Sequence, residues 1–476
     1  MKKKLKITAD IFDNKYLTAL MDFMAFVSPA KTKNETEIRK RDKKLIIEGK
    51  LGQPVERKPA NIGGRLDRNR ILSGTTIFGR VPKVTENDIK LISEAGFDFI
   101  INGNDGEYAK KILDWCEKYN IAVIGKENRK FLKSILLSAD VENPSPLDRF
   151  VPHPASVGDC CSDEPHSSDF GFVQKFHRAY RKHFPDRFVF TNLLPDWGIK
   201  SVWGENSYAE YVDKFPSMVE SDYLSVDVYP FHPSRILNKI GMSLYLNTYH
   251  TIGNACRRDG KDFWLYIQSQ MRWFSHLYTM TTFEMIKWQV YASLCYGCRS
   301  IIHASYNPVW GRDAIGIIDY NGNLTEQYLY VKRVNAEIAK LSPVLKDYRS
   351  LGVEFAKAKR LNHHFVFACR KQKKNNKAQG FTGIPAVKSI ESESTALAGY
   401  FANTQGRNAL MLVNCRNIYD PYASQNITVK FTRKYTVSVY EYGERPKVKG
   451  LVVMDSPGRE PEILTGLAAA GCNVIA

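Results

Sequence analysis

The feature that most constrains the fold is a regular alternation of short apolar runs and amphipathic segments between about residues 73 and 345. Each apolar run has the length and composition of a strand, and the segment after it has helical periodicity. Eight such units of this total size predict a (β/α)8 TIM barrel. The expected strands cover residues 74–79, 97–102, 121–125, 157–164, 187–192, 223–229, 263–268 and 300–305. The expected helices cover residues 86–95, 107–119, 128–137, 169–182, 207–219, 244–258, 282–296 and 326–345.

An open, doubly wound sheet is the alternative for such an alternation, but no Gly-rich phosphate turn follows the first strand. After Pro343 the helical segments give way to short alternating runs separated by Gly, Asn and Pro, which is typical of a β-sandwich. The expected sandwich strands begin near residues 365, 398, 409, 427 and 435, and residues 371–377 are expected to form a basic loop. Three regions follow: an N-terminal extension with little structure (1–65), a barrel (66–345) and a sandwich (346–476).

The net charge of +18 is concentrated at the two ends of the chain. Residues 1–58 carry a net charge of +7 and residues 346–476 a net charge of +10, so the barrel region is nearly neutral. This distribution indicates solvated ends, or ends that attract an anionic matrix, rather than an electropositive catalytic groove. With no specific nucleic-acid motif in the chain, we expect no nucleic-acid partner.

Nine cysteines occur without the spacing of a disulfide framework or a zinc site, and we interpret them as buried thiols. Neither a metal nor another cofactor is expected, because the histidines have no supporting ligand cluster. No apolar run is long enough to span a membrane. The N-terminus begins with lysines and continues into a moderately apolar stretch, but it has no clean signal-peptide cleavage site. The oligomeric state is left open.

The most informative short segment is residues 157–165, an apolar strand that ends in Asp163, Glu164 and Pro165. Proline cannot continue the strand, so the two carboxylates are expected at its C-terminal end, where α/β barrels carry their active sites. Glu164 is therefore the first candidate for a catalytic acid. The alternative is a structural one, in which these polar residues cap the following helix.

Other polar and aromatic residues are expected to meet Glu164, because the C-terminal ends of all eight strands converge. Carboxylates and amides bind sugar hydroxyls, indoles stack on sugar rings, and a pair of carboxylates can cleave a glycosidic bond. This inventory favours a carbohydrate-active site. The expected members are Asn192, Trp197, Asp227, Tyr229, Gln268, Gln270, His303, Tyr306 and Trp310.

The order of several motifs resembles that of clan-A-type glycoside hydrolases, particularly β-galactosidase-like proteins of gut Bacteroidetes. The resemblance runs from about residue 74 to the C-terminus, and it implies a glycoside hydrolase that is periplasmic or extracellular. It also implies that Glu164 matches the family's acid/base residue at the end of strand four. The matching motifs begin at Asp163, Asn192, Tyr208, Ser225, Trp288 and Ile318.

Strand seven departs from the family pattern, because it ends in Gln268, Ser269 and Gln270 where the family has a nucleophilic glutamate. An amide has no anionic oxygen with which to form the usual glycosyl ester. Asp227 is then the best-placed second carboxylate, as base or nucleophile, and Glu205 and Glu284 are further candidates. Gln268 and Gln270 are expected to bind substrate hydroxyls. The competing hypothesis is a protein that binds a glycan on the same scaffold without cleaving it.

Overall fold

The structure is a computed structural model. It describes residues 61–62, 64–79, 82–104, 106–125, 153–196, 200–232, 235–274, 277–308, 315–419, 423–432, 434–439, 452–458, 463–468 and 473–474. Nearly all of the N-terminal extension, the expected helix at 128–137, and both Trp197 and Trp310 lie outside these ranges.

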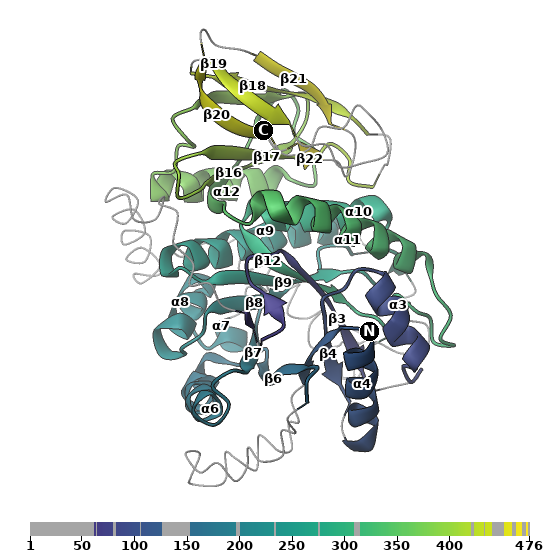
Figure 1. Ribbon diagram of the computed structural model, residues 1–476. Helices are drawn as coiled ribbons and strands as arrows, with labels where there is room; N and C mark the ends of the chain where they lie inside the picture. The colour runs from purple at the N-terminus through teal and green to yellow at the C-terminus, as the bar shows by residue number, and fades with distance from the viewer. Residues whose placement is uncertain are drawn as a thin grey trace, which may run out of the picture.

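Eight parallel strands form a closed barrel, which confirms the predicted fold class (Figure 1). The first and last strands close it, with Ser300 opposite Leu72 and His303 opposite Thr75. The strands are β3 (Leu72–Phe78), β4 (Phe99–Gly103), β5 (Ala122–Gly125), β6 (Ser156–Asp163), β7 (Phe188–Leu193), β8 (Tyr223–Asp227), β9 (Asp262–Gln268) and β12 (Cys298–Ala304). The helices are α3 (Glu86–Glu94), α4 (Gly106–Lys118), α6 (Phe170–His183), α7 (Lys200–Trp203), α8 (Tyr208–Met218), α9 (Arg235–Asp259), α10 (Phe283–Cys295) and α11 (Glu326–Leu345).

The barrel interior is filled by every second side chain of its strands, as the two-residue period of a strand requires. Phe99, Phe190, Tyr223 and Trp264 are the largest members of this interior cluster. Gly74 makes room for them, because a Cβ atom there would lie 2.3 Å from the ring of Phe99. The interior below the mouth is therefore a packed core and not a channel.

A short hairpin covers the N-terminal end of the barrel. It consists of β1 (Asn61–Ile62) and β2 (Leu66–Asp67), and Leu66 belongs to the interior cluster. Arg68 follows the hairpin, and its Nε lies 3.0 Å from a carboxylate oxygen of Asp262 at the start of β9. Because one end of the barrel is covered in this way, only the C-terminal end is available as a mouth.

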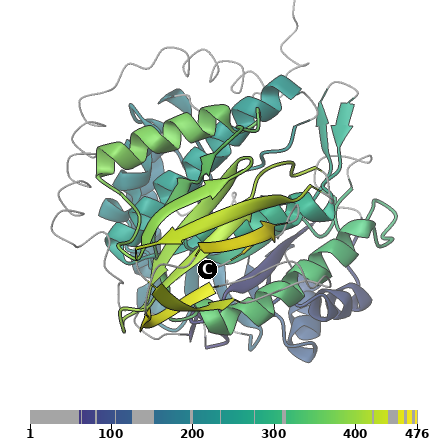
Figure 2. The same cartoon turned by 90° about the horizontal axis from the view of Figure 1, so that it is seen from above.

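Residues after 345 form two packed sheets, which confirms the predicted sandwich (Figure 2). One sheet has the order β13-β16-β17-β20-β19 with β22 beside β17, and the other has the order β14-β15-β18-β21. The strands are β13 (Arg349–Phe355), β14 (Lys357–Ala358), β15 (Val387–Ser392), β16 (Ala396–Ala402), β17 (Asn408–Asn414), β18 (Gln425–Phe431), β19 (Lys434–Val439), β20 (Val452–Gly458), β21 (Ile463–Ala468) and β22 (Asn473–Val474).

One prediction for this region was wrong. The strand expected near residue 365 and the basic loop at 371–377 are a single helix, α12 (Val366–Gln379). Its Lys, Gln, Arg and Ala residues all have high helix propensity, and Gly380 ends it in the left-handed conformation with a φ of 72°. The many charged residues of this segment suggested a loop. The buried side of the helix consists partly of amides in place of apolar residues, including Gln372, Asn375 and Asn376.

Helix α10 joins the barrel to the sandwich. All residues from Met285 to Cys295 are buried, so the helix is covered on every side. Trp288 donates a hydrogen bond from Nε1 to Sγ of Cys415, and a Cβ atom at Gly399 would lie 2.9 Å from the backbone of Cys295. The barrel helices and the first sheet of the sandwich therefore share one hydrophobic core.

A buried ion pair ties α10 to α11. Nζ of Lys287 lies 2.9 Å from Oε1 of Glu337, and the hydroxyl of Tyr291 donates to the other carboxylate oxygen. Replacing Lys287 with Met should lower the free energy of unfolding by about 3–5 kcal/mol, because it leaves the Glu337 charge buried without its partner. Chemical denaturation measures this change. Lys90→Met, which removes an exposed pair with Glu94, is the control and should change stability by less than about 1 kcal/mol.

The cysteine prediction is confirmed for the described residues, in which all eight cysteines are free and seven are buried. Cys160 lies in the barrel interior and Cys161 in the core outside it. Within the described ranges, no helix is both long and apolar enough to cross a membrane.

Candidate active site

The mouth of the barrel carries three carboxylates on two strands. Asp163 ends β6, Glu164 follows it directly, and Asp227 ends β8. A β-bulge at Cys161 shifts the register of β6 against β7, so that both Cys160 and Asp163 line the cavity. In a regular strand two residues three positions apart face opposite sides, so the bulge is what directs Asp163 inward.

Asn192, at the end of β7, holds two of these carboxylates together. Its Nδ2 lies 2.8 Å from Oδ1 of Asp227 and 3.3 Å from Oδ1 of Asp163. The side-chain oxygen of Asn192, Oδ1, accepts a hydrogen bond from the hydroxyl of Ser225, which fixes the orientation of the amide. Because both carboxylate oxygens contact one nitrogen, they lie within roughly 6 Å of each other.

Glu164 adopts an unusual backbone conformation, with a φ of 51°. Few residues other than glycine occupy this left-handed region, and it costs backbone energy that surrounding contacts must offset. Its N–H donates to the carbonyl of Asn192 at 2.8 Å, which continues the pairing of β6 with β7. The side chain is half-buried. Strained residues cluster at active sites, so this geometry supports a functional role for Glu164.

Two tyrosines extend toward the carboxylates from β9 and from the residues just after β8. Burial raises the pKa of the Tyr229 phenol well above its ordinary value, and the neighbouring carboxylates, Asp227 foremost, raise it further. Burial likewise raises the pKa of Tyr266, with Asp163 as the main nearby charge. Both phenols therefore stay protonated and can serve as hydrogen-bond donors at neutral pH.

A small cavity of about 80 Å³ lies among Asp163, Asp227 and the two tyrosines, and Glu164 is not among the described residues that line it. Gln270 reaches it from the end of strand seven, and its Oε1 accepts a hydrogen bond from Ser305. Asn192, Asp227, Tyr229 and Gln270 are thus the predicted site residues that the structure brings together around one space. The lining residues are Thr76, Phe78, Ile101, Cys160, Asp163, Phe190, Asn192, Asp227, Tyr229, Tyr266, Gln270 and Ala304.

Gln268 does not have the predicted position. It is fully buried, its Oε1 accepts from the backbone N–H of Phe231, and its Nε2 donates to the carbonyl of the same residue. Gln289 of α10 binds both backbone groups of Gln268. Its amide is therefore committed to holding the loop after β8, and it is not available to a substrate hydroxyl.

His303 also lies away from the cavity. It is fully buried and faces the helix layer, where its Nδ1 lies 2.7 Å from the hydroxyl of Ser269 and its ring meets Phe97 edge-on. Burial lowers the pKa of its imidazole to about 3. Ile302 and Ala304, its neighbours on β12, face the interior, so strand alternation places His303 outside the barrel.

Tyr306 is likewise a structural residue. Its ring is fully buried, and its hydroxyl donates to Oδ1 of Asp88, the residue that forms the capping box of α3 with Thr85. Tyr306 therefore anchors α3 and does not reach a substrate. Trp197 and Trp310, predicted as sugar platforms, lie outside the described residues.

The further carboxylate candidates have other roles. Glu205 forms an ion pair with Lys214, with 2.6 Å between Oε1 and Nζ. Glu284 lies in the first turn of α10, which Thr282 caps through its side chain. Sequence reasoning had placed Asp163 at the end of strand four without giving it a role, and it did not include Tyr266. Tyr266 could have been predicted from its position two residues after Trp264, because alternate residues of a strand face the same side of the barrel.

Comparisons with known proteins place this geometry in context. The family model described as D-galactarate/Altronate dehydratase, C-terminal, matches residues 424–476, which is too small a part of the chain to show a family for the whole. No protein of curated function matches the sequence. Within the described ranges, no group of three or more His, Cys, Asp or Glu residues could hold a metal ion.

The solved structures to which the chain is similar include several glycoside hydrolases. A catalytic mutant of a β-galactosidase from G. stearothermophilus matches with a TM-score of 0.49 and 9% identity, over 84% of this chain and 98% of that one. A β-galactosidase from the psychrophilic Marinomonas ef1 matches with a TM-score of 0.43 and 10% identity, over 64% of this chain and 65% of that one.

A β-galactosidase from a Rahnella species matches with a TM-score of 0.42 and 13% identity, over 63% of this chain and 60% of that one. The chain thus spans less than two-thirds of the length of the Marinomonas and Rahnella enzymes. Similarities this weak carry no argument about activity.

Proposed function

We propose that the protein is a glycoside hydrolase that acts on an oligo- or polysaccharide by carboxylate acid/base catalysis. The observation that carries this proposal is the presence of Asp163, Glu164 and Asp227 at one mouth, two of them bridged by the amide of Asn192. Cleavage of a glycosidic bond needs one carboxyl group to protonate the leaving oxygen and another to act at the anomeric carbon. Glycan binding alone does not require such a set.

Glu164 is the general acid in this proposal and Asp227 the second carboxylate. Asp227 is held by the Asn192 amide, so its oxygen is fixed in direction before substrate arrives. Glu164 extends from a different strand, beside Asp163. The substrate lies between β6 and β8, and Asp227 attacks the anomeric carbon or activates a water molecule there.

The remaining polar groups bind and orient. Tyr229 and Tyr266 donate hydrogen bonds from protonated phenols, and Gln270 binds a sugar hydroxyl. Asn192 acts as a positioning residue, because its hydrogen-bonding groups already contact Asp163, Asp227 and Ser225. Trp197 and Trp310 remain predicted sugar platforms.

A glycan-binding protein without hydrolytic activity is the second candidate. The observation that favours it is the end of strand seven, where Gln268 is locked to Phe231 and no carboxylate replaces it among residues 268–270. The two candidates differ in whether Asp227 acts as the nucleophile or base at the anomeric carbon, the position at which strand seven has no glutamate.

The test is to measure turnover and binding on the same glycan set. A panel of α- and β-linked 4-methylumbelliferyl glycosides and plant and microbial polysaccharides should include at least one substrate that releases product. Binding of panel members without release of product from any of them would select the glycan-binding protein. Neither binding nor turnover would remove both candidates.

A further inference from the structure

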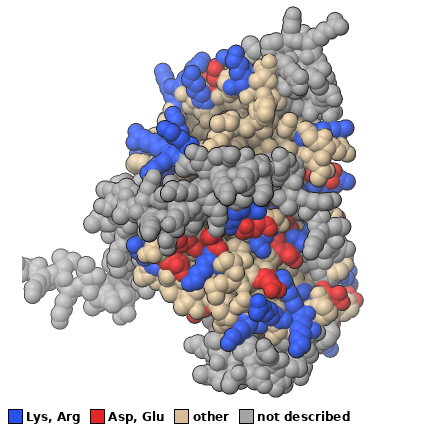
Figure 3. All heavy atoms as spheres, turned by 90° about the vertical axis from the view of Figure 1, so that its left-hand side faces the viewer, with Lys and Arg blue, Asp and Glu red and all other residues tan. Residues whose placement is uncertain are grey.

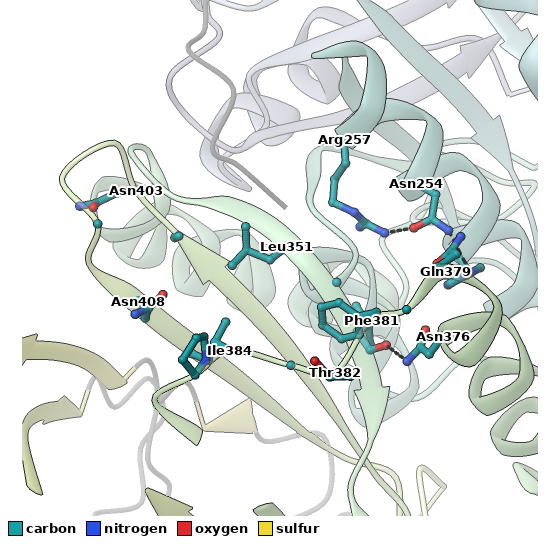
Figure 4. Close-up of a pocket in the computed structure, with 18 of the residues that line it drawn as sticks. Asn254, Arg257, Leu351, Asn376, Gln379, Phe381, Thr382, Ile384, Asn403 and Asn408 are labelled. Atoms are coloured by element: carbon teal, nitrogen blue, oxygen red, sulfur yellow. Dashed lines mark hydrogen bonds between the residues drawn. The ribbon is translucent and has the colours of Figure 1, made fainter. Parts of the chain in front are cut away.

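A second and larger cavity lies between the outer wall of the barrel and the sandwich. Its volume is about 660 Å³, within the range of ordinary small-molecule sites. Side chains from the middle and end of α9, from β13, from the end of α12 and from the turn between β16 and β17 surround it (Figure 4). Nothing in the proposed hydrolysis uses this space.

The cavity is remote from the barrel mouth. Helix α9 follows β8 and runs back toward the N-terminal ends of the strands, where the N–H of Lys261 bonds to the carbonyl of Cys256 just before β9. At 1.5 Å per residue, Arg257 lies roughly 33 Å along α9 from its first residue. A ligand in this cavity therefore occupies a separate site and not an extension of the active-site cleft.

Carboxamides dominate the polar lining. Asn254, Asn376, Gln379, Asn403 and Asn408 all contribute, and none of the described residues that line the cavity is acidic. Carboxamides pair well with sugar hydroxyls, because each offers both donors and an acceptor. The partly exposed ring of Phe381 lies against the backbone of β13 in the same space, where a Cβ atom at Gly352 would approach it to 2.5 Å.

Gln379 is the carboxamide best placed to bind a ligand. The residue as a whole is 7% exposed, and its amide makes no hydrogen bond to any residue that the structure describes. The amide lines the cavity and can therefore bond to a ligand there without giving up a protein partner. The amide of the neighbouring Asn376, by contrast, already bonds to Val353 and Gln372.

The charge of the site is positive. The guanidinium of Arg257 lines the cavity and is positioned by hydrogen bonds to Asn254 and Ser350. Helix α12, which ends at the cavity, carries no acidic residue and exposes Arg370, Lys373 and Lys374. In Figure 3 the charged side chains on the upper part of the molecule are mostly Lys and Arg, whereas Lys, Arg, Asp and Glu are mixed over the lower part.

From this lining we propose that the cavity binds a short acidic oligosaccharide, with a uronate carboxylate or a sulfate group beside Arg257. Guanidinium groups bind both anions in a bidentate manner, and the amides of Gln379 and Asn408 take the sugar hydroxyls. Gln379 binds a hydroxyl next to the acidic group. The site is independent of the proposed hydrolysis, since its ligand is identified from its own lining.

Titration calorimetry with two probes tests this site, namely tri-galacturonic acid and a heparin-derived trisaccharide, with galactotriose as the neutral comparison. At least one acidic probe should bind the full chain about tenfold or more tightly than galactotriose, and about 0.5 M salt should weaken that binding. Gln379→Glu keeps the side-chain shape but adds a negative charge, and it should weaken binding of the acidic probe about tenfold or more.

The matched control is Gln174→Glu, the same change at a half-exposed position of α6. It should leave binding unchanged, and both variants should keep the parent's melting temperature. Failure of both acidic probes to bind, or equal binding by the Gln379→Glu variant, would overturn the proposal. Because Glu164→Gln should not alter this binding, a protein without hydrolytic activity can still contain the site, and the two proposals fail separately.

Discussion

Replacing Asp227 with Ala is expected to reduce kcat by at least about 10³-fold on any substrate that the parent enzyme cleaves. The loss removes the carboxylate that acts at the anomeric carbon, and no other acidic group at the end of β8 or β9 replaces it in the described residues. Added azide should restore part of the turnover and give a glycosyl azide, because the small anion fits the space of the lost carboxylate. Steady-state kinetics and mass analysis of the product measure both effects.

Asp222→Ala, just before the start of the same strand, provides the control. Asp222 lies at the end of β8 opposite Asp227, and its exposed carboxylate is 3.8 Å from the guanidinium of Arg68. Its replacement should leave kcat within about twofold of the parent, because surface pairs contribute little. If Asp227→Ala retained near-parental turnover, Asp227 would have no role at the anomeric carbon and Asp163 would take its place in the mechanism.

The Glu164→Gln variant should lose about 10²–10⁴-fold in kcat on substrates with a poor leaving group. Gln preserves the shape of the side chain and tolerates the same backbone angle, so the change removes the proton and little else. A dinitrophenyl glycoside, whose leaving group needs no protonation, should be affected far less. The basic limb of the pH–rate profile should also disappear, since the general acid that it reports is gone.

Glu205→Gln is the comparison for this experiment. Glu205 lies on the loop after β7 and pairs with Lys214, so its loss should cost little activity. A larger loss in Glu205→Gln than in Glu164→Gln would transfer the acid role to Glu205. Equal losses on good and poor leaving groups would show that Glu164 supports the structure of the mouth rather than donating a proton.

Periodicity along the chain was sufficient to predict the barrel. The alternation of Phe99 and Ile101 with Ile100, for example, places two side chains in the interior and one against the helices. Glu164, at the end of its strand, and Asp227 followed from the same pattern, because parallel strands converge at one end. Local periodicity was therefore enough to predict most of the fold and the positions of Glu164 and Asp227.

What the pattern could not supply was the contact partner of each polar residue. His303 and Tyr306 were placed at the mouth because they lie near the C-terminal end of strand eight, yet His303 faces the helix layer and Tyr306 anchors α3. Gln268 was assigned to substrate because nothing local shows that Phe231, 37 residues earlier, takes both its amide groups. Long-range hydrogen bonds of this kind leave no trace in a single sequence.

The register of β6 is a further feature that a regular pattern cannot contain. The bulge at Cys161 brings Asp163 to the same side as Cys160, and an uninterrupted strand would have turned it outward. Helix α12 was missed for a different reason, because its apolar face is sparse and its amides are buried against α9 and β13. In both places tertiary packing, and not local propensity, decides the structure.

The burial of α10 on every side limits how this architecture can be rearranged. Trp288 and Cys295 contact Cys415 and Met411 across what would otherwise be a domain boundary. Exchanging either the barrel or the sandwich for a domain of another protein would expose Trp288 and a face of the sheet. Recombination at residue 345 should therefore lower the stability of the protein. Barrel and sandwich must be inherited, and must accumulate substitutions, as one evolutionary unit.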